Sequence, residues 1–236
     1  MTKGIPVKLR LTLGIAAVLA VGVPLAVHAD TAADVKQQCG SCHALDHDYA
    51  KAAKHERAER KAPPLDFAGN KFRREWLYSW LQNPVRLRPA GVFPPAHAKP
   101  SADGDVVDTA TLAKHPALDA AQAGKVADYL MTLTPFDALI AAETYQPGSI
   151  AQRMGQMNFG KFKGCDGCHQ DAPDKGGVSG PELYTAWQRL QPAFISAYIT
   201  QPAAWDPHTM MPVGDANAAA VHKLANYLKL IGEKQP

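Results

Sequence analysis

After residue 29 the sequence has no excess of charge of either sign and no second long apolar run. Three of the 25 basic residues, Lys3, Lys8 and Arg10, lie before residue 30. The other 22 equal the 22 acidic residues in number. Nucleic-acid binding needs clustered cations, so this neutral body argues against it. No serine–histidine–aspartate, paired-carboxylate or nucleotide-binding motif is present either. Runs of β-branched residues are few and alanine is abundant, which favours helices over strands.

One long apolar run lies near the N-terminus, between the three basic residues and Ala29. Val27-His28-Ala29 offers small residues at the positions that a signal peptidase reads. We therefore interpret residues 1–29 as a cleaved signal peptide or a retained membrane anchor. Either form predicts export to the bacterial periplasm, free or tethered to the inner membrane. Membrane contact is expected only if the segment is retained.

The four cysteines form two copies of one motif, and no cysteine is left over. The motifs are Cys39-Gly-Ser-Cys42-His43 and Cys165-Asp-Gly-Cys168-His169. C-x-x-C-H is the signature of covalent c-type haem attachment, because the two thiols reach the two vinyl groups of one porphyrin. The histidine that follows then binds the iron. A redox disulfide or a zinc site can also use C-x-x-C, but neither needs a histidine after each second cysteine. The sequence thus predicts two covalently bound haem c groups, with His43 and His169 as iron ligands.

A related stretch follows each motif, so the chain contains an internal repeat. Aligning Pro64-Leu65 with Glu182-Leu183 gives a stretch without gaps. The paired positions in it are Trp76 with Phe194, Pro84 with Pro202, and Phe93 with Met211. Phe93 and Met211 are each followed by a proline. Each copy then closes with a helical run that ends in Tyr-Leu.

Each copy resembles a class I cytochrome c domain, and the pair resembles the diheme cytochromes c of the cytochrome c4 kind. The resemblance covers residues from about 31 to the C-terminus. It implies an all-α fold of two tandem domains, 30–135 and 150–236, with a linker at 136–149. It also implies that an N-terminal and a C-terminal helix cross beside each haem. In the second copy, Gly160 and Phe162 lie where such domains often place a small residue and an aromatic against the closing helix.

The resemblance further implies that a Met-Pro loop supplies the sixth iron ligand, which maps onto Met211. This loop, 205–213, contains two prolines, so it is not helical and can present a side chain inward. A thioether is a soft ligand that holds both oxidation states of iron and raises the potential. Met210 is the neighbouring alternative, and a simple core role for Met211 is the other interpretation.

The first copy departs from this pattern, because Phe93 cannot bind iron. It also carries two insertions. One contains the charged run 51–61, which we interpret as a solvated helix face. The other, 96–116, contains His97 and His115. Three options follow for the first haem: ligation by His97, ligation by His115, or an open position beneath Phe93.

The stretch from Arg73 to Leu81 is typical of an amphipathic helix, with Trp76 and Trp80 on one face. We expect these rings to wall the haem crevice.

These features predict a carrier of single electrons between periplasmic or membrane redox partners, such as members of a respiratory chain. A His/His haem has a lower potential than a His/Met haem, so the first haem would donate to the second. Two alternatives stay open. One is a haem oxidoreductase or small-ligand sensor that acts at an open first haem. The other is a cytochrome subunit of a larger oxidoreductase complex.

Overall fold

The computed structural model describes residues 1, 26–46, 58–102, 104–143, 145–212 and 216–235. Helices dominate this part of the chain, so the fold is mostly α-helical. The expected all-α class holds only in this coarser form, because the described strands form two short antiparallel pairs. None of the helices described is long and apolar enough to cross a membrane. Residues 2–25, which carry most of the predicted targeting segment, lie outside the described residues.

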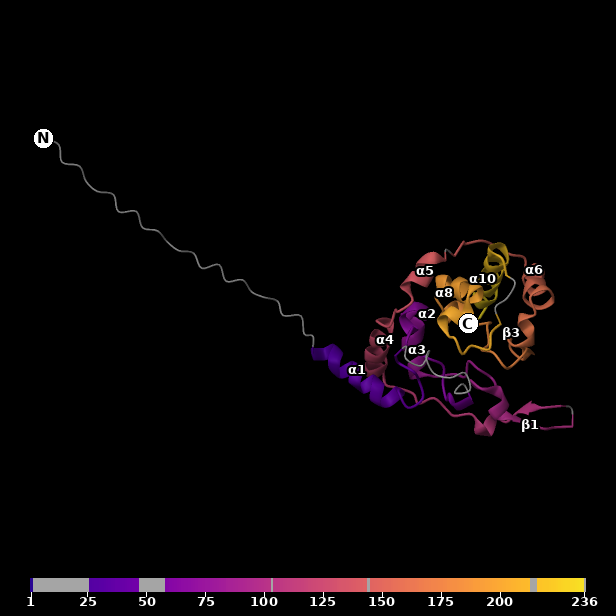
Figure 1. Cartoon of the computed structure of the whole chain (residues 1–236), viewed down its shortest axis with the longest axis horizontal. Coiled ribbons are helices and arrows are strands. Elements are labelled where there is room, and N and C mark those ends of the chain that lie inside the picture. The colour runs from indigo at the N-terminus through magenta and orange to yellow at the C-terminus, as the bar shows by residue number, and fades with distance from the viewer. Residues whose placement is uncertain (2–25, 47–57, 103, 144, 213–215, 236) are drawn as a thin grey trace.

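The helices of the first copy lie together at the end of the body where α1 is found (Figure 1). Its helices are α1 (Ala26–Cys39), α2 (Ala68–Lys71), α3 (Arg74–Gln82) and α4 (Ala120–Met131). Between α3 and α4, the inserted stretch forms two 3-10 turns, Pro94–His97 and Thr109–Thr111. It also forms a hairpin of β1 (Ala98–Lys99) and β2 (Val106–Val107), which projects from the body in Figure 1.

The second copy begins after a short helix, α5 (Asp137–Ala142), that lies in the predicted linker. Its first helix is α6 (Gln152–Gln156), continued by a π-helical turn over Met157–Phe162. A 3-10 turn (Cys165–Gly167) and the hairpin of β3 (Gln170–Ala172) and β4 (Lys175–Gly176) follow. The remaining helices are α7 (Ala186–Arg189), α8 (Pro192–Thr200), α9 (Pro202–Trp205) and α10 (Ala218–Gly232).

The repeat seen in the sequence recurs in the helices. α7 and α8 begin 118 residues after α2 and α3, and α10 begins 98 residues after α4. Side-chain caps begin both closing helices: Asp119 accepts from the Gln122 backbone N–H at 2.8 Å, and Asn217 accepts from that of Ala220 at 3.0 Å. The two copies therefore share one order of elements, and the inserted loop between α3 and α4 accounts for the shorter offset.

The first and last helices of each copy pack together, α1 on α4 and α6 on α10. In the second copy this crossing lies at Gly155, where an added Cβ would stand 2.1 Å from the Tyr227 ring. Phe159 packs beside it, 5.8 Å from that ring. The expectation of Gly160 and Phe162 at the crossing is wrong, because Phe162 is 54% exposed. The π-helical turn over Met157–Phe162 changes which residues share a face, which a regular 3.6-residue period does not anticipate.

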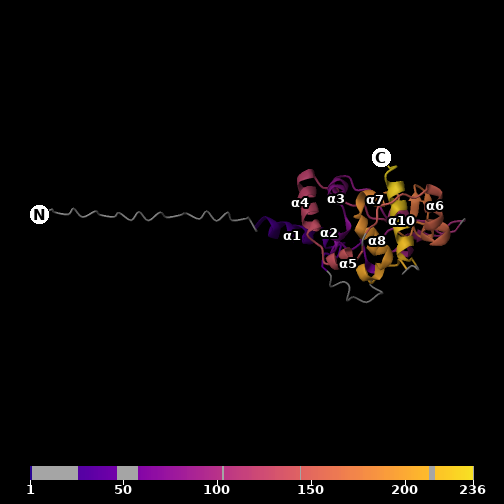
Figure 2. The ribbon, with the colours of Figure 1, turned by 90° about the horizontal axis from the view of Figure 1, so that it is seen from above.

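The two copies lie side by side, with α2 next to α8 (Figure 2). Two matching backbone hydrogen bonds join them: Arg73 N–H to the Arg189 carbonyl and Gln191 N–H to the Lys71 carbonyl, both at 2.9 Å. Their donors are equivalent in the repeat, and so are their acceptors. The copies therefore meet through the same segment used twice, around an antiparallel bridge of Phe72 with Leu190.

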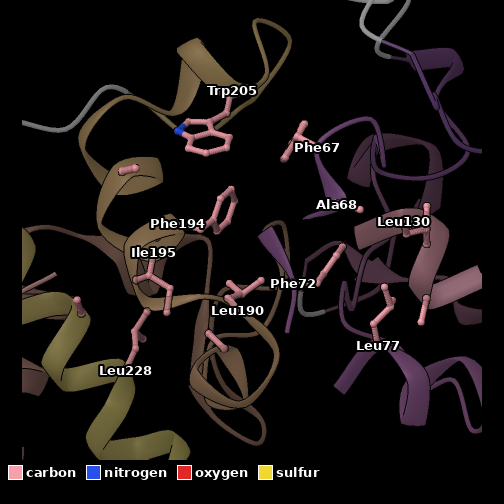
Figure 3. Packing of buried hydrophobic residues seen from close by; sticks show 14 of the residues in the cluster. Phe67, Ala68, Phe72, Leu77, Leu130, Leu190, Phe194, Ile195, Trp205 and Leu228 are labelled. Atoms are coloured by element: carbon pink, nitrogen blue, oxygen red, sulfur yellow. The ribbon is translucent and has the colours of Figure 1, made fainter. Parts of the chain in front are cut away.

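An aromatic cluster fills the contact between the copies (Figure 3). The Phe194 ring lies 4.8 Å from Trp205 and 6.2 Å from Phe67, so residues of both copies share one core. Phe136 covers this cluster, 5.1 Å from Trp205 and 5.6 Å from Phe67. Aromatic pairs of this kind contribute about 0.5–1.5 kcal/mol beyond the area they bury. Phe136, the first residue of the linker, therefore packs in the core that the two copies share.

Candidate functional site

The two cysteine motifs adopt the same tight turn. The Cys39 carbonyl accepts hydrogen bonds from the backbone of Cys42 at 3.1 Å and His43 at 2.9 Å. The Cys165 carbonyl accepts from Cys168 at 3.2 Å and His169 at 2.9 Å. In each motif the first thiol is half-buried and the second is exposed, and none of the four is in a disulfide. Both turns therefore hold two thiols and an imidazole close together.

Each motif histidine is oriented by a proline carbonyl. The Nδ1 atoms of His43 and His169 lie 2.7 Å from the carbonyl oxygens of Pro63 and Pro181, respectively. A carbonyl oxygen can only accept, so Nδ1 carries the proton and Nε2 keeps its lone pair. The two prolines are equivalent in the repeat. Both copies therefore present an imidazole in the tautomer and orientation that a metal ligand needs.

Burial lowers the pKa of both imidazoles below the ordinary value for histidine. For His43 the charges of His115 and Lys71 act in the same direction, and for His169 those of Arg88 and Arg189 do. Neutral imidazole is the form that binds a metal. The electrostatics of both sites thus favour the ligating form at neutral pH.

The donor atoms of each motif fit the protein groups that a haem c needs. Among the described residues, no group of three or more His, Cys, Asp and Glu side chains converges as a metal site would require. A porphyrin brings four equatorial nitrogens of its own, so it needs from the protein only axial ligands and, for haem c, two thiols. Each motif offers the two thiols and one imidazole within one turn.

In the first copy, the structure brings His115 close to His43. Their ring centroids lie 6.2 Å apart, with an angle of 61° between the ring planes. The His115 ring also packs against Trp80, at 4.6 Å between centroids. Its Nδ1 lies 2.8 Å from the carbonyl oxygen of Pro116. His115 is therefore oriented by a proline carbonyl, as both motif histidines are.

His97, the other histidine considered at sequence level, is engaged elsewhere. Its Nδ1 lies 2.8 Å from Thr111 Oγ1, whose hydroxyl donates to the Asp108 carbonyl at 2.7 Å. Its ring packs on Gly91, where an added Cβ would stand 2.9 Å from His97 Nε2. Gly91 has φ of +73°, a backbone conformation that suits glycine. His97 therefore joins the start of the inserted loop to its second 3-10 turn.

The aromatic face predicted for α3 is present. Phe72, Trp76 and Trp80 stack in sequence, with centroids 5.5 and 5.7 Å apart, and His115 continues the row. The row runs from the contact between the copies to the neighbourhood of His43. Phe93, the counterpart of Met211, is half-buried where the turn Pro94–His97 begins.

In the second copy the structure distinguishes the two adjacent methionines. Met210 is 45% exposed, whereas Met211 is half-buried. The Met211 backbone N–H donates to Thr209 Oγ1 at 3.2 Å, and a hydrogen bond of 3.0 Å joins that oxygen to the Tyr198 hydroxyl. Tyr198 is the counterpart of Trp80. Equivalent aromatic side chains thus contact the segments that carry Met211 and His115.

A group of cations between the copies, of which Arg189 is buried and Lys71 and Arg88 are half-buried, was not anticipated from the sequence. Burial lowers the pKa of Arg88 and Arg189, and burial together with their charges lowers that of Lys71 to about 7. Arg189 pairs with Glu182 at 3.5 Å. Lys71 and Arg189 are equivalent in the repeat, and this equivalence is the sequence signal that could have revealed them.

Arg60 corrects the interpretation of residues 51–61 as a solvated helix face. Its guanidinium makes two hydrogen bonds, of 2.8 and 3.3 Å, to the Asp206 carboxylate in the second copy. Both side chains are mostly buried, with 17% and 11% exposed. Residues 51–57 of that run lie outside the described residues. The insertion therefore contributes a cross-copy contact near the loop of Met211.

Comparison of the chain with known protein families, with curated proteins and with solved structures found no match.

Proposed function

We propose that the chain is a diheme c-type cytochrome that transfers single electrons, built from two tandem cytochrome c-like domains. The observation that carries the proposal is the matched pair of C-x-x-C-H turns. In both turns a proline carbonyl lies 2.7 Å from the histidine Nδ1 and leaves Nε2 to a metal. Two such arrangements, 126 residues apart by their first cysteines at 39 and 165, match two haems and not one.

Each haem would be held by side chains of its own copy. Cys39 and Cys42 would form the thioether links of the first haem, and His43 would bind its iron. Cys165, Cys168 and His169 would do the same for the second haem. Met211 is the sixth ligand proposed for the second iron, since its side chain is half-buried and Met210 is exposed. When bound, a haem supplies an iron that gains or loses one electron.

Three cations have a role in this proposal. The charge of Lys71 acts on His43, and the charges of Arg88 and Arg189 act on His169, so all three lie near the motif histidines. Burial lowers the pKa of each, and a negative charge nearby would stabilise their charged forms. A haem carries two carboxylates, which supply the negative charge that such groups need. We assign these three residues to stabilising the haem carboxylates between the copies.

Unequal ligands would give the relay a direction. The first copy has Phe93 where the second has Met211, so its iron lacks the thioether that raises the potential. The first haem would then donate electrons and the second would accept them. The shared core joins the two copies, so it would hold two haems at a constant separation, which a relay requires. Export to the periplasm and redox proteins or a membrane oxidoreductase complex as partners belong to the same proposal.

Potentiometric titration of the exported protein, followed by visible absorption, tests this function. We expect two one-electron waves with separate midpoints, the lower one assigned to the first haem by its loss in a Cys39→Ser/Cys42→Ser variant. One shared midpoint for both haems would refute the directional relay. A haem that stays oxidised under every reductant tested would refute electron transfer through it.

A further inference from the structure

We propose that His115 is the sixth ligand of the first iron, delivered by the inserted loop to replace the methionine that this copy lacks. This inference rests on the proposed function, because it presupposes a haem bonded to Cys39 and Cys42. It identifies which of the candidate histidines binds the metal and assigns a purpose to the insertion at 96–116.

The separation of the two imidazoles fits two axial ligands of one iron. A nitrogen ligand lies about 2.0 Å from its metal, so two imidazoles on opposite sides of one metal place their ring centres roughly 6.3 Å apart. The centroids of His43 and His115 are 6.2 Å apart. The angle of 61° between their planes is compatible with this role, since each ring can rotate about the axis through its nitrogen and the metal. At 61° the two rings are not stacked in parallel. T-shaped ring pairs share this range of distances, so the assignment rests equally on the tautomer and on the loop contacts.

His115 is also in the required tautomer. Its Nδ1 lies 2.8 Å from the Pro116 carbonyl, which can only accept, so the proton is on Nδ1 and the lone pair is on Nε2. His43 is fixed in the same way by Pro63, at 2.7 Å. Both rings therefore have Nε2 available as the ligand atom.

The loop holds His115 from both sides. After it, the Leu118 N–H donates to the carbonyl of Leu81, at the end of α3, at 2.9 Å. Before it, Arg86 donates to the Ala113 carbonyl at 3.4 Å. Trp80 packs on the ring itself, 4.6 Å away, and donates through its indole N–H to the Val85 carbonyl at 2.9 Å. A ligand held by this many contacts loses little conformational freedom when it binds.

The repeat supports the same assignment. Trp80 and Tyr198 are equivalent, and Tyr198 is joined to Thr209, whose oxygen accepts from the Met211 backbone. One position on the third helix of each copy therefore supports the segment that carries the distal residue. His97 does not compete, because the Cδ2–Nε2 edge of its ring packs on Gly91 and the ring that lies beside His43 is that of His115.

The test compares His115→Ala with His97→Ala as the matched control, in the full exported protein. His115 is exposed, so its loss should leave the polypeptide fold intact. We expect the wild type and His97→Ala to show two low-spin ferric haems by electron paramagnetic resonance. His115→Ala should show one high-spin haem that binds carbon monoxide when reduced, and added imidazole should return it to low spin. His115→Met should stay low-spin with a raised potential.

Two other results would overturn the inference. The first is a high-spin haem in the wild type, which indicates an open iron beneath Phe93. The second is a high-spin haem in His97→Ala with His115→Ala unchanged, which makes His97 the ligand. The number of haems per chain, measured as the pyridine haemochrome, separates these results from a failure of the proposed function. A chain without haem would refute both proposals, whereas two haems with the wrong spin states would refute the His115 assignment alone.

Discussion

Replacing Gly155 with alanine should force α6 and α10 apart in the second copy. The added Cβ would stand 2.1 Å from Cδ2 of Tyr227 and 2.7 Å from its Cγ. Non-bonded carbon atoms prefer about 3.5–4.0 Å, so the helices must separate by roughly 1.5 Å or the ring must move. The close approach of these two helices depends on the absence of a side chain at this position.

The Tyr227 ring has little room to move. It is 1% exposed, it packs against Phe159, and its hydroxyl donates to the Asp171 carboxylate at 2.6 Å. Overpacking a core costs about 1–3 kcal/mol, and loss of a buried hydrogen bond adds about 1–3 kcal/mol. We therefore expect Gly155→Ala to lower the free energy of unfolding by about 2–5 kcal/mol.

Urea unfolding of the haem-loaded protein, followed by far-ultraviolet circular dichroism and haem absorbance, measures this loss. The matched control is Gly124→Ala in α4, where an added Cβ would meet its nearest atom, Cε2 of Tyr78, at 3.9 Å. This control should raise the free energy of unfolding by about 0.5–1 kcal/mol, because alanine restricts the unfolded chain. Equal stability of the two variants would refute the helix crossing described here.

Three further changes test other contacts. Arg60→Ala should lower the free energy of unfolding by about 1–3 kcal/mol, because the Asp206 carboxylate, 11% exposed, loses its ion-pair partner. An unchanged midpoint of urea unfolding would contradict this. Gln191 donates to the Gly69 carbonyl at 2.6 Å and the Phe72 carbonyl at 3.0 Å. Gln191→Ala should therefore cost about 1–2 kcal/mol and speed proteolysis in the linker, and equal cleavage rates would count against the cross-copy contact. Met211→Ala should remove the long-wavelength charge-transfer band of a sulfur-ligated ferric haem and lower one midpoint, whereas Met210→Ala should change neither; the reverse pattern would make Met210 the ligand.

Much of the helical repeat could be predicted from local patterns in the sequence. The spacing of the cysteine motifs and the alignment of Leu65 with Leu183 anticipated two copies with equivalent helices, because helix starts and caps depend on nearby residues. The shared face of Trp76 and Trp80 followed from helical periodicity, and their rings stack at 5.7 Å. Their expected place at the wall of a haem crevice stays a prediction.

The remaining features depend on contacts between distant segments. Arg60 reaches Asp206 across 146 residues of sequence, which no local charge pattern can indicate. His97 lies closer in sequence to the lost methionine position, yet the structure places His115 beside His43, since the hairpin and turns of the insertion decide which residue returns to α3. Gly155 was missed in favour of Gly160 because a π-helical turn shifts the contacting face.

The intact mass of the exported protein tests the central claim most directly. We expect a mass about 1.2 kDa above that of the polypeptide, for two covalent haem c groups, and about half that excess after Cys165→Ser/Cys168→Ser. The denatured chain should also keep its peroxidase-active haem stain in a gel. A purified protein with the mass of the bare polypeptide and no stain would contradict the account.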